Sequence, residues 1–373
     1  MNVILFFTYG VSLKEWETSG LLSREIKLYK ELSDKYNVKF TFITYGDSQD
    51  FEFLNLIDDL QIIPIYDLIK FSKNKYLRFL KSLLVPFYLK KFVNKDFKII
   101  KTNQLNGSWV PIIYKVITDA SLYIRTGYDL YLFSKYDKKN KAKQYFYFFL
   151  TFIASKAADV YSVTSRSDFE ILKQKFRFKS NKLTLIPNWI TNVSKTKKIE
   201  DRNNDIVCVG RLEKQKNYRF IIESLKNTEF NVNIYGEGSE KEKLYMIAKD
   251  SKNIQFKGNV TNSELLDEYI DHKYFISLSK YEGNSKAILE AMASGCVVIA
   301  SKIKNNIELI DHFENGILFD LELDNLIDVV KKIDSNYELQ KKLSKNSIKK
   351  VYENNSLEVI LEKEYEVYKN ISK

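Results

Sequence analysis

Short apolar runs alternate with stretches of helical spacing along the first half of the chain. Val3–Phe7 and Val38–Thr44 are typical of buried strands, and the apolar residues of segment 21–35 between them recur at roughly helical spacing. Ser165 with Asp168 is typical of the start of a helix. Further strands are predicted at Ile99–Lys101, Leu122–Arg125, Val160–Thr164 and Leu183–Ile186.

A second series of the same kind follows. Strands are predicted at Ile206–Val209, Asn231–Tyr235, Ile254–Phe256, Phe275–Leu278 and Val297–Ala300. Helices are predicted between them at Glu240–Lys249, Ser263–Tyr269 and Ala287–Ala293. Strands separated by helices indicate parallel, doubly wound α/β sheets, whose ligands bind beyond the carboxyl ends of the strands.

The length of 373 residues exceeds one ordinary core and predicts two α/β domains. We place a Rossmann-like N-terminal domain at 1–190 and a second such domain at 206–355. Residues 191–205 have few apolar and many charged side chains, which indicates a linker. We expect residues 356–373 to form a C-terminal helix that packs back on the N-terminal domain.

The net charge of +11 is unevenly distributed. Residues 1–200 carry 33 Lys and Arg against 19 Asp and Glu, whereas residues 201–373 carry 26 against 29. A basic half beside a near-neutral half suggests an anionic partner for the first half, and charge alone leaves nucleic acid, anionic lipid and phosphorylated substrates open. Segments 70–101 and 138–156 mix lysines with aromatic residues, which suits an anionic membrane surface. They equally suit core helices with solvated basic faces.

Several features predict a cytoplasmic protein, either free or at the inner face of the membrane. Met1 leads directly into a strand without the basic start of a signal peptide, and no uninterrupted apolar stretch reaches 18 residues. Cys208 and Cys296 lie inside apolar runs and are expected to be buried and reduced, as in a reducing compartment.

Two loops with glycine follow the ends of predicted strands in the second half. After IVCV, Gly210 allows a tight turn, so that Arg211 and Lys216 can reach one anion together, although basic loop residues are often merely solvated. After NVNI, Gly236 and Gly238 allow a ligand to approach the backbone, or they mark an ordinary turn. The pattern lacks the third glycine of a dinucleotide fingerprint, which argues against a nicotinamide enzyme.

The segment 279–293 is the most informative part of the chain. A strand ends, a polar loop with Glu282 and Gly283 follows, and a helix begins near Ser285. Amides at a helix start suit a diphosphate, and carboxylates such as those of Glu282 and Glu290 suit sugar hydroxyl groups. Upstream, the main chain of FKGNV, ending at Val260, could contact a nucleobase, or it could be a simple strand end.

Taken in order, GRLEKQKN, YGEGSE, FKGNV and EGNSKAILEAMASGCVVIA resemble the donor-binding domain of the family 4 retaining glycosyltransferases. The resemblance covers about 100 residues, and IPNWI (186–190) is similar to the segment that closes the family's first domain. It implies an α/β GT-B fold, in which two Rossmann-like doubly wound domains face each other across an inter-domain cleft. Residues 1–190 would then bind the acceptor and residues 206–355 the nucleotide sugar.

The resemblance also implies roles for individual residues. Arg211 and Lys216 would neutralise the departing diphosphate and Glu282 would hold hydroxyls of the transferred sugar, which makes these three the candidate catalytic residues. Glu290 would hold the ribose. The implied donor-binding residues are Gly20, Arg125, Gly210, Gly236, Gly238, Val260, Gly283, Asn284, Ser285, Lys286, Ala287, Leu289 and Glu290. No cofactor or metal is implied, and His272 and His312 have no metal-ligand spacing.

The chain departs from the family pattern in three places. Asn284-Ser285 replaces the Phe-Pro that many members carry, so sugar preference does not transfer. The first 200 residues contain no His, and Arg125 is our candidate for the missing side chain, with an inter-domain ion pair as the alternative. Both Gly10 and Gly20 follow the first strand, and we favour Gly20 because a helix begins just after it.

The sequence therefore predicts a metal-independent, retaining hexosyltransferase. It would move a sugar from a UDP-sugar, with GDP as the second choice, to a glycan or lipid-linked acceptor in surface polysaccharide or glycoconjugate synthesis. Its expected partners are the nucleotide sugar, that acceptor and an anionic membrane surface, but not nucleic acid. Two alternatives are another GT-B enzyme, epimerase or phosphorylase-like, and a basic nucleic-acid-binding protein, for which no recognition motif is visible.

Overall fold

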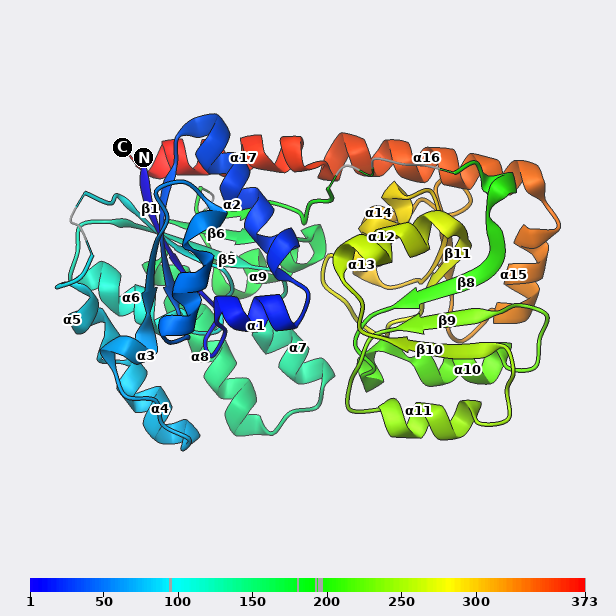
Figure 1. Cartoon of the computed structure of the whole chain (residues 1–373), viewed down its shortest axis with the longest axis horizontal. Coiled ribbons are helices and arrows are strands. Elements are labelled where there is room, and N and C mark those ends of the chain that lie inside the picture. The colour runs from blue at the N-terminus through cyan, green and yellow to red at the C-terminus, as the bar shows by residue number, and fades with distance from the viewer. Residues whose placement is uncertain (94–95, 180, 192, 194–196, 373) are drawn as a thin grey trace. The chain divides into compact units, whose positions relative to one another are not determined.

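The computed structural model describes residues 1–93, 96–179, 181–191, 193 and 197–372, and the chain divides into two compact units (Figure 1). The first unit comprises Met1–Ile186 with Leu361–Lys373, and the second comprises Pro187–Ile360. The first unit thus ends four residues before the predicted boundary at 190, and the last residues of the chain return to it.

The first unit is built on a seven-stranded parallel sheet in the order β3-β2-β1-β4-β5-β6-β7. The strands are β1 (Asn2–Phe6), β2 (Lys39–Thr44), β3 (Gln61–Pro64), β4 (Ile99–Thr102), β5 (Ser121–Thr126), β6 (Val160–Val163) and β7 (Leu183–Leu185). All were predicted except β3. The order reverses between β1 and β4, as in a doubly wound sheet.

Helices connect these strands. They are α1 (Leu13–Thr18), α2 (Leu22–Tyr36), α3 (Ile65–Leu68), α4 (Lys75–Ser82), α5 (Val85–Leu89), α6 (Trp109–Val116), α7 (Leu130–Tyr136), α8 (Lys141–Ala157) and α9 (Arg166–Phe176), with a 3-10 helix at Ser48–Leu56. The Ser165 hydroxyl accepts a hydrogen bond from the Asp168 amide at 3.1 Å, so Ser165 caps α9 as predicted.

The predicted C-terminal helix is α17 (Leu357–Ile371), and its residues from Leu361 onward belong to the first unit. Inside that unit Lys101 of β4 forms an ion pair with Glu364 of α17, and both side chains are fully buried. The Tyr123 hydroxyl also donates to Glu364 at 3.0 Å. These contacts fasten the end of the chain to the sheet of the first unit.

The second unit contains a six-stranded parallel sheet in the order β10-β9-β8-β11-β12-β13. The strands are β8 (Asn203–Val209), β9 (Val232–Tyr235), β10 (Ile254–Gly258), β11 (His272–Ser277), β12 (Val297–Ser301) and β13 (Ile317–Phe319). The first five agree with the predicted strands, and β13 was missed. Two parallel sheets with helical connections confirm the predicted α/β class.

The helices of the second unit include all three that were predicted. They are α10 (Tyr218–Leu225), α11 (Lys241–Ala248), α12 (Asn262–Asp271), α13 (Lys286–Ala293), α14 (Lys304–Leu309), α15 (Leu326–Asp334) and α16 (Tyr337–Asn355), with 3-10 helices at Ile199–Asp201 and Lys214–Lys216. Cys208 and Cys296 are buried free thiols in this unit, and burial raises the pKa of each to about 12.

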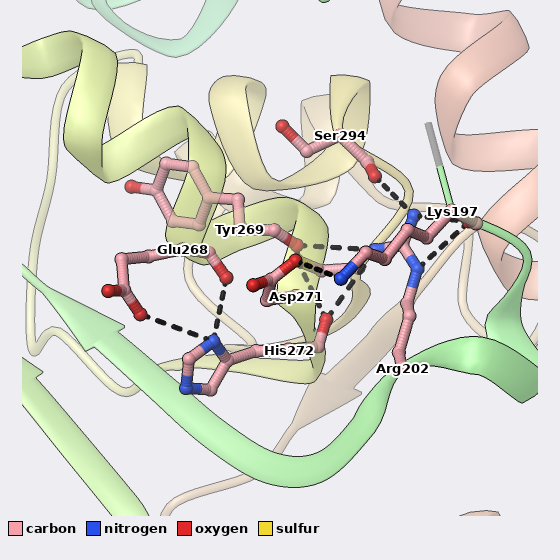
Figure 2. Close-up of polar contacts among 8 residues, drawn as sticks. Lys197, Arg202, Glu268, Tyr269, Asp271, His272 and Ser294 are labelled. Atoms are coloured by element: carbon pink, nitrogen blue, oxygen red, sulfur yellow. Dashed lines mark hydrogen bonds and ion pairs between the residues drawn. The ribbon is translucent and has the colours of Figure 1, made fainter. Parts of the chain in front are cut away.

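The predicted linker 191–205 is largely part of the second unit. Residues 192 and 194–196 lie outside the described residues, but Asn203–Asp205 belong to β8. Arg202 is buried, and its guanidinium donates to the carbonyl oxygens of Ser294 at 2.6 Å and Tyr269 at 3.2 Å (Figure 2). The charge-rich composition of this segment therefore did not predict that Arg202 is buried, with its N–H donors bonded to backbone oxygens.

Among the helices of the described ranges, none has the length and the apolar character that crossing a bilayer requires.

Candidate functional site

The strand order of the second sheet brings two of the predicted motifs together. β8 and β11 pair in the middle of the sheet, where the order of the strands reverses. The loop 210–216 follows β8, and the loop 278–285 follows β11. Both loops leave the carboxyl ends of neighbouring parallel strands at the reversal, which is where ligands bind in doubly wound sheets.

An ion pair joins these two loops. Lys216 Nζ lies 2.5 Å from Glu282 Oε2, and the two side chains are only 14% and 13% exposed. The Ser279 hydroxyl donates to the same Glu282 oxygen at 3.1 Å. The structure thus holds two of the three predicted catalytic side chains together, and it adds Ser279, which the sequence analysis missed.

Backbone and amide contacts also tie the loops. The Lys280 amide donates to the Gln215 carbonyl oxygen at 2.9 Å, and Gln215 Nε2 donates to the Tyr281 carbonyl oxygen at 2.8 Å. These bonds fix the spacing between the basic loop and the glutamate loop. An anion bound between the loops would therefore meet groups whose positions are already set.

Gly236 and Gly238 allow the loop after β9 to touch the loop after β8. Gly236 has φ of +133°, and a Cβ there would lie 2.2 Å from the Gly210 carbonyl oxygen. A Cβ on Gly238 would lie 2.5 Å from the Leu212 carbonyl oxygen. Because those contacts are with backbone, only glycine fits at either position.

Tyr218 forms a hydrogen bond with the backbone of Gly210. Burial raises the pKa of Tyr218 well above its usual value of 10.0, so its hydroxyl stays neutral and acts as a donor. That hydroxyl donates to the Gly210 carbonyl oxygen at 3.2 Å, and the Gly210 amide donates to the Tyr235 carbonyl oxygen at 3.0 Å. The turn before Arg211 is therefore held on both sides.

Arg211 is the most accessible of the three predicted catalytic residues. Its side chain is exposed, unlike those of Lys216 and Glu282. The nearby Glu213 carboxylate accepts from the Ser239 amide and hydroxyl at 3.0 and 2.7 Å, and these bonds, with a smaller effect of the Arg211 charge, lower the pKa of Glu213. Arg211 thus lies on the side of the basic loop that faces solvent.

The start of α13 is the second candidate anion site. Ser285 is the N-cap residue, but its side chain makes no capping hydrogen bond. The amides of the first helical turn point beyond the end of the helix, where the helix dipole favours negative charge. Gly283 and Ser285 are buried, Ala287 is half-buried, and Lys286 Nζ lies 4.5 Å from the centre of the Trp189 ring.

Asn284 is held by a residue that sequence reasoning missed. The Asn188 amide donates to Asn284 Oδ1 at 3.0 Å, and Asn188 Nδ2 donates to the Asn284 carbonyl oxygen at 2.6 Å. Asn355 Nδ2 in turn donates to the Asn188 carbonyl oxygen at 2.8 Å. The side chain of Asn284 therefore positions the loop. The sequence signal was the IPNWI segment, which the analysis had noted only as a domain end.

Glu290 lies on the buried side of α13. Its side chain is 6% exposed, and Asn262 Nδ2 donates to Glu290 Oε1 at 3.2 Å. Asn262 begins α12, where Thr261 and Glu264 form a capping box. A carboxylate held here can accept hydrogen bonds from a diol, and Asn262 is a further polar group that the sequence analysis had not selected.

Leu289 and Val260 contribute packing. Leu289 is fully buried in the core of the second unit, and its amide donates to the Ser285 carbonyl oxygen at 3.1 Å. Its side chain and its amide are both engaged within the unit, which corrects the expectation that it lines the donor. Val260 packs partly buried against the same core, so only its main chain is offered to a ligand.

Gly20 and Arg125 lie in the first unit. Gly20 has φ of +70° between α1 and α2, a conformation that favours glycine. Arg125 of β5 is 4% exposed, and its charge acts on Lys101 and Tyr29 inside the unit. We had expected Arg125 to contact phosphate or acceptor, with an inter-domain ion pair as the alternative; its charge lies near Lys101 and Tyr29, and a contact with a ligand stays a prediction.

The residues that the structure describes contain no cluster of three or more His, Cys, Asp or Glu that could hold a metal ion. His272 Nδ1 is 2.7 Å from the Glu268 carbonyl oxygen, and its Nε2 is 2.8 Å from Asn233 Nδ2 (Figure 2 shows the first contact). His272 therefore has a structural role between α12 and β9.

Comparison with known proteins agrees with this geometry. Residues 190–350 match the family model described as glycosyl transferases group 1. The capsular polysaccharide biosynthesis glycosyltransferase CapH of Staphylococcus aureus is 36% identical over 151 residues, which span 36% of this chain and 39% of CapH. The N-acetylgalactosamine-N,N'-diacetylbacillosaminyl-diphospho-undecaprenol 4-alpha-N-acetylgalactosaminyltransferase of Campylobacter jejuni is 25% identical over 283 residues, or 68% of this chain and 72% of that enzyme.

Solved structures resemble the chain over its whole length. Anabaena Alr3699/HepE in complex with UDP and glucose has a TM-score of 0.77 and 14% identity, covering 99% of this chain and all of that one. A glycosyltransferase from Rickettsia africae has a TM-score of 0.73 and 20% identity, covering 100% of this chain and 99% of the other. Residues 190–350 thus resemble the group 1 glycosyltransferases, and the chain as a whole has the GT-B fold that the sequence predicted.

Proposed function

We propose that this protein transfers a hexose-type sugar from a nucleoside diphosphate sugar to a glycan or lipid-linked acceptor. The observation that carries the proposal is the Lys216–Glu282 pair at the reversal of the second sheet, beside the start of α13. Fixed cations and free amides bind a diphosphate, and carboxylates accept hydrogen bonds from sugar hydroxyl groups. The loops after β8 and β11 and the start of α13 provide both kinds of group.

The ion pair gives a physical account of how donor binding prepares the site. Without a ligand, Lys216 neutralises Glu282. A diphosphate at the helix start provides Lys216 with a second anionic partner, which frees Glu282 to accept from a sugar hydroxyl. Arg211 and Lys216 then stabilise the charge that grows on the departing diphosphate, so they act mainly on the transition state.

Glu290 and Asn262 support recognition of the nucleoside. A buried carboxylate with an amide beside it can accept from both ribose hydroxyls while Asn262 keeps it in place. Because the cations and the α13 amides already supply positive charge to the diphosphate, we propose that transfer proceeds without a bound metal. Retention of anomeric configuration belongs to the same proposal and rests on the family resemblance.

The named relatives favour a UDP-sugar donor and a surface-glycan acceptor. CapH is named for capsular polysaccharide biosynthesis, the Campylobacter enzyme for a diphospho-undecaprenol-linked sugar, and the Anabaena structure contains UDP and glucose. We accordingly propose UDP ahead of GDP, and synthesis of a surface polysaccharide or glycoconjugate, as the role of this protein.

A thermal-shift screen of nucleotide sugars and nucleoside diphosphates, with and without EDTA, tests the proposal. A ligand at a hundred times its Kd should stabilise the protein by about 2.7 kcal/mol, which raises Tm by several degrees. Glu290→Gln should lose this shift, whereas Lys249→Gln, which alters an exposed lysine at the end of α11, should keep it. Equal shifts in both variants, or no shift with any UDP- or GDP-sugar, would contradict the proposal.

A further inference from the structure

The helix α4 places its apolar side chains in solvent. Only Ser82 of its eight residues is buried, whereas Tyr76 is 70% and Leu80 58% exposed. An eight-residue helix is marginal in water unless its apolar face is buried. The adjoining segment 84–92 continues the pattern with exposed Leu84, Phe87, Tyr88 and Phe92.

The helix α8 also exposes a row of large apolar side chains. Its buried residues are Leu150, Thr151, Ala154 and Ser155, which are mostly small or polar. Its exposed face carries the larger apolar residues Tyr145, Phe146, Phe149, Phe152 and Ile153, at the i, i+1, i+4, i+7 and i+8 positions of a helix. Tyr147 and Phe148 of α8 pack partly buried against the core, so the helix carries large apolar residues on its exposed side as well as on its packed side.

The two helices form one continuous surface. Phe79 of α4 and Phe146 of α8 have ring centres 6.2 Å apart, and Trp109 contacts both rings. Trp109 Nε1 also donates to the Ser82 hydroxyl at 2.9 Å, which anchors α4 to α6. Figure 1 shows α4 and α8 on the side of the first unit away from α17. We call the exposed side chains of 70–93 and 138–157 the basic aromatic face.

The charge of this face has one sign. Residues 70–93 contain seven Lys and Arg and residues 138–157 contain five lysines, and neither segment contains an acid. The neighbouring Asp137 pairs with Lys139 at 3.0 Å. Lys75 and Lys156 extend over Tyr76 and Phe152, a geometry that lets an ammonium group stay at the headgroup level while its stem covers apolar surface.

A cavity of about 370 Å³ opens beside the exposed aromatic residues of α8. Tyr145 and Phe149 of the basic aromatic face line it, together with Lys135, Lys141 and Lys175. Three ammonium groups around a hollow next to an apolar face provide a place for a phosphate headgroup whose acyl chains lie against the aromatic rings.

We propose that the basic aromatic face docks the first unit on an anionic lipid bilayer. Exposed aromatic residues enter the interface while the surrounding lysines contact the negative headgroups, which is the chemistry of a peripheral membrane surface. A second copy of this chain fits poorly, because it would bring two acid-free rows of lysines together. The inference stands on the first unit alone and does not depend on the proposed function.

Flotation of the full-length protein with vesicles tests this docking. Binding should occur with phosphatidylcholine vesicles that contain phosphatidylglycerol, should weaken at high salt, and should be much weaker with pure phosphatidylcholine. The charge variant neutralises four exposed lysines, and at about fivefold for each lysine it should bind about 600-fold more weakly. Its substitutions are Lys75→Gln, Lys91→Gln, Lys141→Gln and Lys143→Gln.

A second pair of variants measures how much the exposed apolar side chains, as distinct from the lysines, contribute to vesicle binding. Leu80→Ser with Phe149→Ser should weaken vesicle binding at least about tenfold. The matched control, Met246→Ser with Leu323→Ser, removes apolar side chains of the second unit that are at least as exposed, and it should bind vesicles like the wild type. All variants should keep the wild-type Tm and the nucleotide-dependent thermal shift, so a failure here is distinct from a failure of the proposed function.

Three results would overturn the proposal. The first is no flotation of the wild type with phosphatidylglycerol vesicles at low salt. The second is equal binding by the wild type and by both face variants. The third is a dimer that dissociates on Leu80→Ser with Phe149→Ser while no vesicle binding occurs, which would identify the face as a contact between copies.

Discussion

The close contact between the loops after β8 and β9 makes Gly236→Ala a sharp perturbation. The added methyl group would lie 2.2 Å from the Gly210 carbonyl oxygen, where ordinary contacts begin at about 3.4 Å. The Gly210 oxygen belongs to the backbone and the position of the new Cβ is set by the backbone of residue 236, so no side-chain rotation can relieve this contact. The loops must separate by roughly 1.2 Å, which displaces the turn that leads to Arg211 and Lys216.

The magnitude follows from this displacement. A shift of about 1 Å in a positioning element can reduce an enzymatic rate about a hundredfold, and we expect that loss in kcat/KM. The backbone strain of a non-glycine residue at φ of +133° adds about 1–3 kcal/mol of destabilisation. We also expect UDP to bind more weakly, because the cations no longer meet the diphosphate in their fixed positions.

Gly258→Ala is the matched control. Gly258 also has positive φ, at +70°, and lies at the end of the neighbouring strand, but a Cβ there would be 3.5 Å from Glu237 Oε1, an ordinary contact. This variant should lose about 1–2 kcal/mol of stability and keep UDP binding. Titration calorimetry with UDP on both variants decides the matter. If Gly236→Ala binds UDP as tightly as Gly258→Ala, our account of the glycine contact is incorrect.

Three further predictions concern single side chains. Lys216→Ala and Glu290→Ala should each lower turnover by at least about a hundredfold with an unchanged circular dichroism spectrum, and a fully active variant of either would contradict the site. Burial raises the pKa of Asp129 from 3.8 to about 6, so the stability that this group contributes at low pH is lost as the pH rises from 4 to 7. Asp129→Asn cannot titrate and should therefore gain about 3 kcal/mol relative to the wild type over that interval, measured as the difference in urea unfolding midpoints; a pH-independent difference would refute this. Lys101→Met leaves the Glu364 carboxylate buried without its partner and should destabilise the first unit by about 3–5 kcal/mol, whereas adding Glu364→Gln should restore most of the loss in thermal melts.

The strands in the middle of each sheet could be predicted because their apolar runs are long enough to stand out. β12 is buried along its whole length, and β8 is buried over its apolar run 206–208. The missed strands β3 and β13 are four and three residues long and lie at the edges of their sheets, where one partner strand suffices. Short edge segments give a weak signal, although β7, which is equally short and also at an edge, was predicted.

The chemistry of the site could be predicted, but its geometry could not. Glycine, cation and carboxylate motifs mark the ends of strands, so Lys216 and Glu282 could be selected one by one. Their contact across 66 positions of the chain depends on β11 pairing with β8, which no local pattern encodes. The same holds for Asn188 and Asn284, which are 96 positions apart.

Two buried arginines show where composition is misleading. Arg202 lies in the charge-rich segment that we had interpreted as a linker, and Arg125 is the residue for which we had expected a contact with phosphate or acceptor, or an inter-domain ion pair. Both are buried, Arg202 against carbonyl oxygens and Arg125 in an interior that also holds the Lys101–Glu364 pair. A buried charge depends on partners that are distant in the sequence, so composition alone assigns it to the surface.

The most direct test of the central claim is a crystal structure of the full chain with UDP. We predict that the diphosphate lies within hydrogen-bonding distance of the amides at the start of α13 and of Arg211 and Lys216, with the ribose at Glu290. A nucleotide bound elsewhere in the chain, with the Lys216–Glu282 pair undisturbed, would contradict the account.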